Sequence, residues 1–326
     1  AIRDGSDVTA QTVTVTATDS LTIVMVATAV SVAASADAAF SFSQTLTASL
    51  GLNFVTDEVT AIIASSKVTA DGAVVVAAST EPNITAVAVG IAIAVAGSAA
   101  AAGAVALAGA VTINEVSMAA TSAVMDSLVS DGRGVTASSL SVTATDDSIV
   151  VSAPVVAALS VSVGSVGVAV SIGVAVALND IANASDASIA SVDATITDDV
   201  VVTATERSRF TATPTAVSIG VSVSALSISI AGTVPAARNL LANSARAAIE
   251  GGSTVIADDV LVTASSTTNA LTVATAVSVA ISAAPGLSLA ATFANSLAIN
   301  LIEDRASAVI DSSDVSAAGA VTVAAD

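Results

Sequence analysis

Residues 142–146 read Val-Thr-Ala-Thr-Asp, and versions of this short phrase return along the whole chain. The valines that begin the copies are Val15, Val76, Val142, Val202, Val262 and Val323. Successive copies are therefore 61, 66, 60, 60 and 61 residues apart. A fixed period of this length is typical of repeat proteins, in which one structural unit stacks on the next.

A second marker has the same period. An asparagine follows each of the first five valines by 37 or 38 residues: Asn53, Asn114, Asn179, Asn239 and Asn300. The single longer spacing indicates about five inserted residues, which we expect near Asp131-Gly132-Arg133-Gly134 as an outward loop. Residues 1–326 are thus expected to form one repeat array, and their matching ends suggest a segment of a longer array.

Composition excludes several classes of function. The chain has no Cys, His, Trp or Tyr, so a structural zinc site, a haem ligand, a disulfide and a Ser-His-Asp triad are all excluded. Its formal charge of −19 argues against nucleic acid as a partner. Apolar residues make up 54% of the chain and charged residues only 11%, which argues against disorder.

Two uncharged stretches, 83–113 and 148–179, are long enough to span a membrane as helices. Large and small residues alternate within them, however, as in Val166-Gly167-Val168-Ala169-Val170, and this period of two predicts strands. Aromatic residues amount to 2%, too few for the girdles of an outer-membrane barrel. We therefore expect a β-protein that does not span a membrane, and Ala1–Asp4 shows no signal-peptide pattern.

The predicted fold is an all-β solenoid of about five repeats of about 60 residues. Two geometries compete: one wide, multi-strand rung per repeat, or three shorter rungs of about 20 residues each. The wide rung is favoured because the sequence has no similarity at a 20-residue offset and its apolar runs are long. Pro285-Gly286 and Gly251-Gly252 lie between such runs, where turns are expected.

Stacking in register makes residues 60 or 61 apart into neighbours. Asp7 should then lie beside Lys67, and Asp186 beside Arg246, as opposite-charge pairs. The asparagine column is expected to form an internal amide ladder or a turn, in preference to a ligand site.

The same stacking places like charges together, Asp198 on Asp258 and Asp199 on Asp259. These carboxylates could point apart into solvent, raise the pKa of one member, or bind a cation such as Ca²⁺. Solvated turns are the favoured interpretation, and the four aspartates are the candidate metal ligands. The remaining acids are expected to form a soluble rim.

The alternation also predicts how strands face the core. In residues 217–224 the large residues share one face and Ser or Gly the other. We expect the large face to fill the rung interior, and the small face to make a close contact within the fold or between protomers.

Three stretches carry a common phrase of Asn, Ala-x-Ile, Val-x-Ala and Val-x-Val-x-Ala: residues 179–204, 239–264 and 300–325. In this the chain resembles the repeat regions of giant secreted bacterial adhesins of the filamentous-haemagglutinin-like and leukotoxin-like type. The resemblance implies an extracellular, elongated β-structure on the bacterial surface with a structural or adhesive role, and it supplies no catalytic residues.

The leading functional hypothesis is therefore a non-catalytic fibre segment that self-associates head to tail or laterally and contacts cell surfaces or glycans. A flat-surface binder of ice or glycan is the first alternative, because Thr-x-Thr pairs such as Thr14/Thr16 and Thr203/Thr205 could align across rungs. A polysaccharide-active β-helix enzyme is the second, and the missing Trp and Tyr argue against it. No cofactor is expected apart from the calcium considered above.

Overall fold

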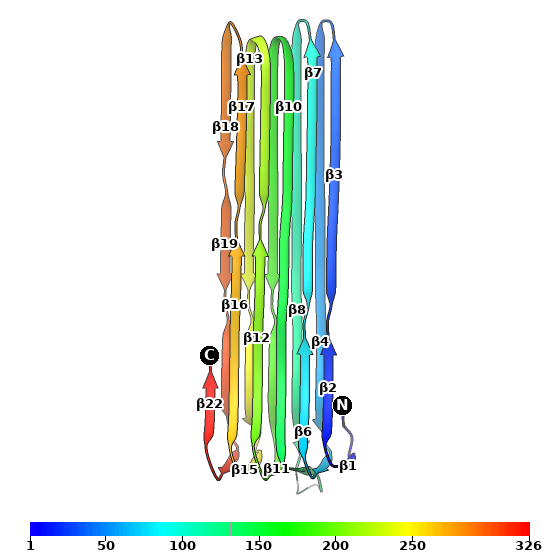
Figure 1. The fold of residues 1–326 in the computed structure, drawn as a ribbon, viewed down its shortest axis with the longest axis vertical. Helices are drawn as coiled ribbons and strands as arrows, with labels where there is room; N and C mark the ends of the chain where they lie inside the picture. Colours follow the sequence, from blue (N-terminus) through cyan, green and yellow to red (C-terminus); the bar gives the residue numbers. More distant parts are fainter. Residues whose placement is uncertain (129, 131) are drawn as a thin grey trace.

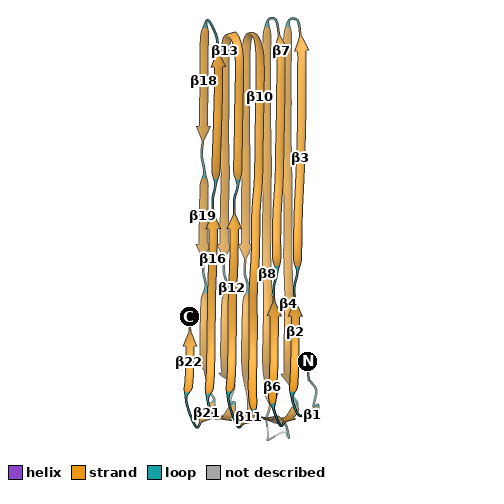
Figure 2. Cartoon of the chain, viewed as in Figure 1, coloured by secondary structure: helices purple, strands orange, loops and turns teal. Residues whose placement is uncertain are grey.

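The fold is known from a computed structural model that describes residues 1–128, 130 and 132–326. It is all-β, and its strands form one large, mostly parallel sheet that does not close on itself. The chain rises along a front layer, turns, descends along a back layer and crosses at the base through a short third side (Figure 1). Long strands account for nearly the whole molecule (Figure 2).

The strands fall into four groups. The rising strands are β2 (Val13–Asp19), β3 (Thr22–Asp37), β6 (Ala73–Thr80), β7 (Asn83–Ser98), β12 (Val200–Ala212), β16 (Val260–Thr272), β17 (Thr275–Ala283) and β22 (Val321–Ala325). The descending strands are β4 (Phe40–Ala64), β8 (Ala101–Ser127), β11 (Ala184–Ile196), β14 (Ser244–Glu250), β18 (Leu287–Ala294), β19 (Leu297–Ile302) and β20 (Arg305–Ile310). Two strands rise and descend without a break, β10 (Ser139–Ile181) and β13 (Thr215–Leu241). The short third side holds the end of β11 and the strands β1 (Asp7–Ala10), β5 (Lys67–Ala70), β9 (Gly134–Ala137), β15 (Thr254–Ala257) and β21 (Asp314–Ala317).

Proline and left-handed residues interrupt these strands. Pro82 and Pro214, which have no amide hydrogen to donate, lie in the breaks between β6 and β7 and between β12 and β13. The predicted turns are confirmed: Pro285 and Gly286 lie in the bend between β17 and β18, and Gly251 and Gly252 have φ angles of 70° and 77° at the base corner.

Pairing follows the sequence period. Paired residues are 59 to 67 positions apart, and the described residues show no pairing at the 20-residue offset of a three-rung coil. The offset changes from 61 at Ala64 and Met125 to 67 at Val68 and Val135. The inserted residues therefore lie between β8 and β9, where the loop was expected, although Asp131 itself is outside the described residues.

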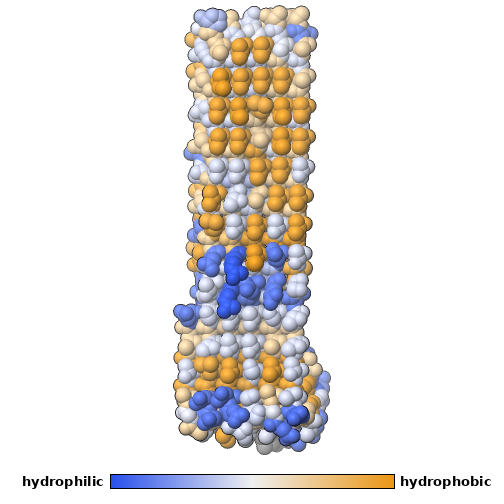
Figure 3. All heavy atoms as spheres, in the orientation of Figure 1, coloured by the Kyte–Doolittle hydropathy of each residue, from blue (hydrophilic) through white to orange (hydrophobic). Residues whose placement is uncertain are grey.

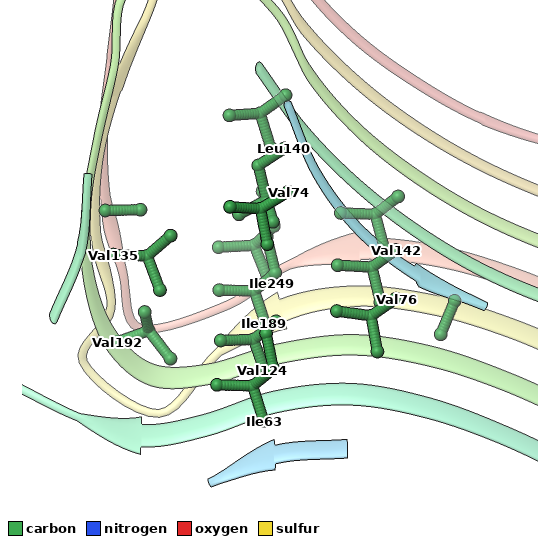
Figure 4. Close-up of a cluster of buried hydrophobic side chains, with 14 of the residues drawn as sticks. Ile63, Val74, Val76, Val124, Val135, Leu140, Val142, Ile189, Val192 and Ile249 are labelled. Carbon is green, nitrogen blue, oxygen red and sulfur yellow. The ribbon is translucent and has the colours of Figure 1, made fainter. Parts of the chain in front are cut away.

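The base holds a core of large side chains. Ile63, Val124, Ile189 and Ile249 come from successive paired strands and form a continuous buried column (Figure 4). The third side widens the molecule here, so branched side chains fit inside. In this region the large residues fill the interior, as predicted.

Above the base the prediction is wrong, because the small face points inward. Ser218 and Ser222 are fully buried, whereas Val223 on the same strand is 45% exposed. The buried cluster between the layers consists almost entirely of alanines from β7, β8 and β10. Two layers joined by a tight turn, with no third side between them, leave room mainly for small residues such as Ala, Ser, Gly and Thr.

The layers approach so closely that backbone meets backbone. A Cβ atom added to Gly90 on β7 would lie 2.4 Å from the carbonyl oxygen of Gly109 on β8. Inner serines donate hydrogen bonds to carbonyl oxygens of the opposite layer, as Ser162 does to Ala102 (2.8 Å) and Ser49 to Ala27 (2.8 Å). The close contact expected of the small face is thus made inside the fold.

Candidate functional site

A buried acidic pair lies between the base core and the layers above it. Asp146 on β10 pairs in register with Glu206 on β12, and both side chains are fully buried. They were expected on the soluble rim, and that expectation is wrong. The sequence does contain a signal that Asp146 is buried. Side chains alternate along a strand, and Val142 and Ala144 point inward, so Asp146, two residues further on, must also point inward.

Hydroxyl and amide groups surround the pair. Thr80 and Ser148 donate to the two carboxylate oxygens of Asp146, each at 2.5 Å, and Asn183 donates to Oδ1 at 3.1 Å. Glu206 accepts hydrogen bonds from Ser208 and, at 3.1 Å, from Ser266. This polar layer satisfies the carboxyl groups without a positively charged partner.

Burial sets the protonation of both acids. Removal from water raises the pKa of Asp146 above its ordinary value, against hydrogen bonds that lower it. Burial likewise raises the pKa of Glu206 to about 7, and the nearby carboxyl group of Asp146 adds to the rise. Burial therefore favours the neutral form of both carboxyl groups, and it brings the pKa of Glu206 close to neutral pH.

The asparagine column forms a continuous ladder. Each Nδ2 donates to the Oδ1 of the next asparagine, from Asn53 to Asn114 (2.8 Å), on to Asn179 (2.6 Å), to Asn239 (2.8 Å) and to Asn300 (2.6 Å). Asn114 and Asn239 are fully buried. The internal amide ladder expected from the sequence is confirmed.

The predicted ion pairs are confirmed as well. The Nζ of Lys67 lies 3.7 Å from a carboxylate oxygen of Asp7, and a guanidinium nitrogen of Arg246 lies 3.3 Å from Asp186. Arg246 also pairs with Glu250. These side chains are about a third or more exposed, so each pair contributes little to stability.

The four candidate calcium ligands lie at the base corner and are exposed. The amide of Asp258 donates to the carbonyl oxygen of Asp198 (2.7 Å), and Asp259 Oδ1 accepts from the amide of Ala320 (2.6 Å). Among the described residues no three acidic side chains gather closely enough to hold a metal ion. Ca²⁺ takes six to eight oxygen ligands that converge on one point. Calcium binding by Asp198, Asp199, Asp258 and Asp259 therefore stays a prediction.

The threonine pairs of the flat-surface alternative lie on the outer side of the front layer. Thr143, Thr203 and Thr263 follow one another in register, and the hydroxyls of Thr203 and Thr263 are 3.1 Å apart. Ala77 replaces threonine between Thr16 and Thr143 and breaks the column.

The outer surface of the upper front layer is not explained by the fold alone. Because the small residues point inward, rows of Val, Ile and Leu point outward across β3, β7, β10, β13 and β17 (Figure 3). We call this surface the apolar face. It consists of the outward residues of 24–36, 85–97, 151–163, 211–223 and 271–283, which include the last residues of β12 and β16 and carry some threonines in the lower rows.

The apolar face is uncharged and strongly exposed at its margins. None of its five ranges contains Asp, Glu, Lys or Arg. Val32 is 65% exposed and Ile281 50%. Contiguous apolar surface on this scale marks an interaction site in soluble proteins.

Comparison with family models, with curated proteins and with solved structures finds no match to this chain. In the part of the chain that the structure describes, no helix is both long enough and apolar enough to cross a membrane.

Proposed function

We propose that this chain is a non-catalytic structural segment of an extracellular bacterial surface fibre with an adhesive role. One observation carries the proposal: corresponding residues pair in register along nearly the whole length of the strands, as between β4 and β8 and between β10 and β13. A stacked array is a stiff element whose length grows with each added unit, which is what a fibre requires. In this account the chain is one array of about five wide coils, one for each repeat of about 60 residues.

The interior supports a structural role. The asparagine ladder and the hydrogen-bonded serines join successive units through their side chains as well as their backbones. In the described part of the chain, β4 pairs along only one edge, with β8, and β18 likewise with β13. Such open edges can add further strands, so copies would join head to tail.

Electron microscopy and fibre diffraction of the concentrated full chain test this proposal. We expect fibrils whose strands lie across the fibril axis, with a reflection at about 4.8 Å along that axis. Particles that stay at the size of one copy and lack this reflection would contradict the fibre function. A parallel sample in EDTA tests calcium separately: loss of fibrils only there would support a cation at the Asp198/Asp258 column.

A further inference from the structure

The apolar face lacks a partner in the single chain, and its shape suits a second sheet. Its central rows consist of apolar side chains alone, with Leu159 on β10 between Ile93 and Ile219. Flat sheets with such rows pack face to face at about 10 Å when their side chains interdigitate.

We propose that the apolar face packs against the same face of a second copy of this chain. The inference rests on the proposed structural function, for which it names the lateral partner and the surface used. The contact is isologous, which means that both copies use the same surface. Residues at the centre of the apolar face in one copy therefore lie against the centre of the apolar face in the other.

The area is sufficient for a stable pair. From residue 24 to residue 36 the face is about 40 Å long, and across β3, β7, β10, β13 and β17 it is about 24 Å wide. Two copies would thus bury about 1,900 Å² together, near the upper end of the range of about 1,200–2,000 Å² for specific interfaces.

The charge distribution also favours a second copy of this chain as the partner. The chain carries a net charge of −19, yet the upper layers are uncharged apart from Asp37 at a turn. If the strands of the two copies run in opposite directions, their acidic bases lie at opposite ends of the pair. The copies can then approach through their apolar faces without bringing those charges together.

The back layer offers a less regular surface. Its outward positions include Gly103 and Gly232, and side chains of adjacent strands lie over them: a Cβ on Gly103 would come within 2.9 Å of the ring of Phe42. Phe293 lies over Gly232 in the same way. These rings fill holes within one copy, whereas the central front rows contain no glycine and stay free for a partner.

Sedimentation velocity of the full chain over a range of concentrations tests the inference. We expect the wild type to dimerise and Leu159→Lys to raise the dissociation constant by about a hundredfold or more, because a two-fold contact buries the new charge twice. Val174→Lys is the matched control, since Val174 points outward from the back layer and is 36% exposed. It should dimerise like the wild type.

Circular dichroism and thermal unfolding of both variants establish that each is folded. Unchanged association of Leu159→Lys, or equal loss in both variants, would overturn the inference. So would a monomeric wild type that floats with phosphatidylcholine vesicles, because lipid would then be the partner. Fibre diffraction of Leu159→Lys distinguishes the fibre proposal from the lateral-pairing proposal. If the variant still stacks but no longer pairs laterally, it keeps the reflection at about 4.8 Å.

Discussion

Gly90→Ala is expected to lower the free energy of unfolding by about 3 kcal/mol, at the upper end of the cost of overpacking. The new methyl group would lie 2.4 Å from the carbonyl oxygen of Gly109 and 3.1 Å from its carbonyl carbon. Both atoms belong to the backbone of the opposite layer, so no side-chain rotation can relieve the contact. The two layers must separate locally, and the alanines around them lose their packing.

Gly97→Ala is the matched control for this substitution. Gly97 lies on the same strand, β7, but a Cβ added there has no atom within 4 Å. Its substitution should change stability by no more than about 0.5 kcal/mol. Guanidinium unfolding of the two variants beside the wild type measures the difference. Equal stability of Gly90→Ala and Gly97→Ala would show that the layers are further apart than described here.

Glu206 should make the protein less stable as the pH rises. Its pKa is about 7 in the folded protein against an ordinary 4.5, so the folded state keeps a proton that the unfolded state has released between these values. Stability is therefore full below about pH 4.5, falls through the interval and is lower by about 3 kcal/mol above pH 7. Asp146 acts in the same direction, since its pKa is also raised.

Glu206→Gln should remove most of this dependence. The amide resembles the protonated acid in shape and keeps an oxygen to accept the hydrogen bond from Ser208. We expect the variant to exceed the wild type by about 3 kcal/mol at pH 8 and to match it near pH 4. Urea unfolding at both pH values measures the effect, with the exposed Glu58→Gln as control. A wild-type stability that rises from pH 5 to pH 8, with no gain in the variant, would contradict the buried pair.

The repeat phrase contained enough information for the register. Spacings between valine and asparagine anchors predicted which residues would pair, and Asp7 with Lys67 and Asn179 with Asn239 meet as expected. The repeat period sets which residues of neighbouring strands pair, and this period can be read from a single sequence. The ladder could be predicted for the same reason, because identical residues at a fixed offset must meet when the units stack.

The facing of the upper strands could not be predicted in the same way. A strand that alternates Val with Ser normally buries the valine, and at the base the branched side chains are indeed inside. The upper layers are too close for such side chains, and their separation depends on the absence of a third side, a property of the whole circuit. Asp146 and Glu206 were assigned to the rim because carboxylates are seldom buried, although their alternation with Val142 and Val202 pointed inward.

Thiol labelling most directly tests the central claim, that small residues pack inside and large residues face outward. The chain has no cysteine, so single substitutions report without background. Val174 is 36% exposed, and its neighbour Ala175 is fully buried between the layers. Val174→Cys is predicted to react with a maleimide at once, and Ala175→Cys only after unfolding. Fast labelling of Ala175→Cys with protection of Val174→Cys would contradict the account.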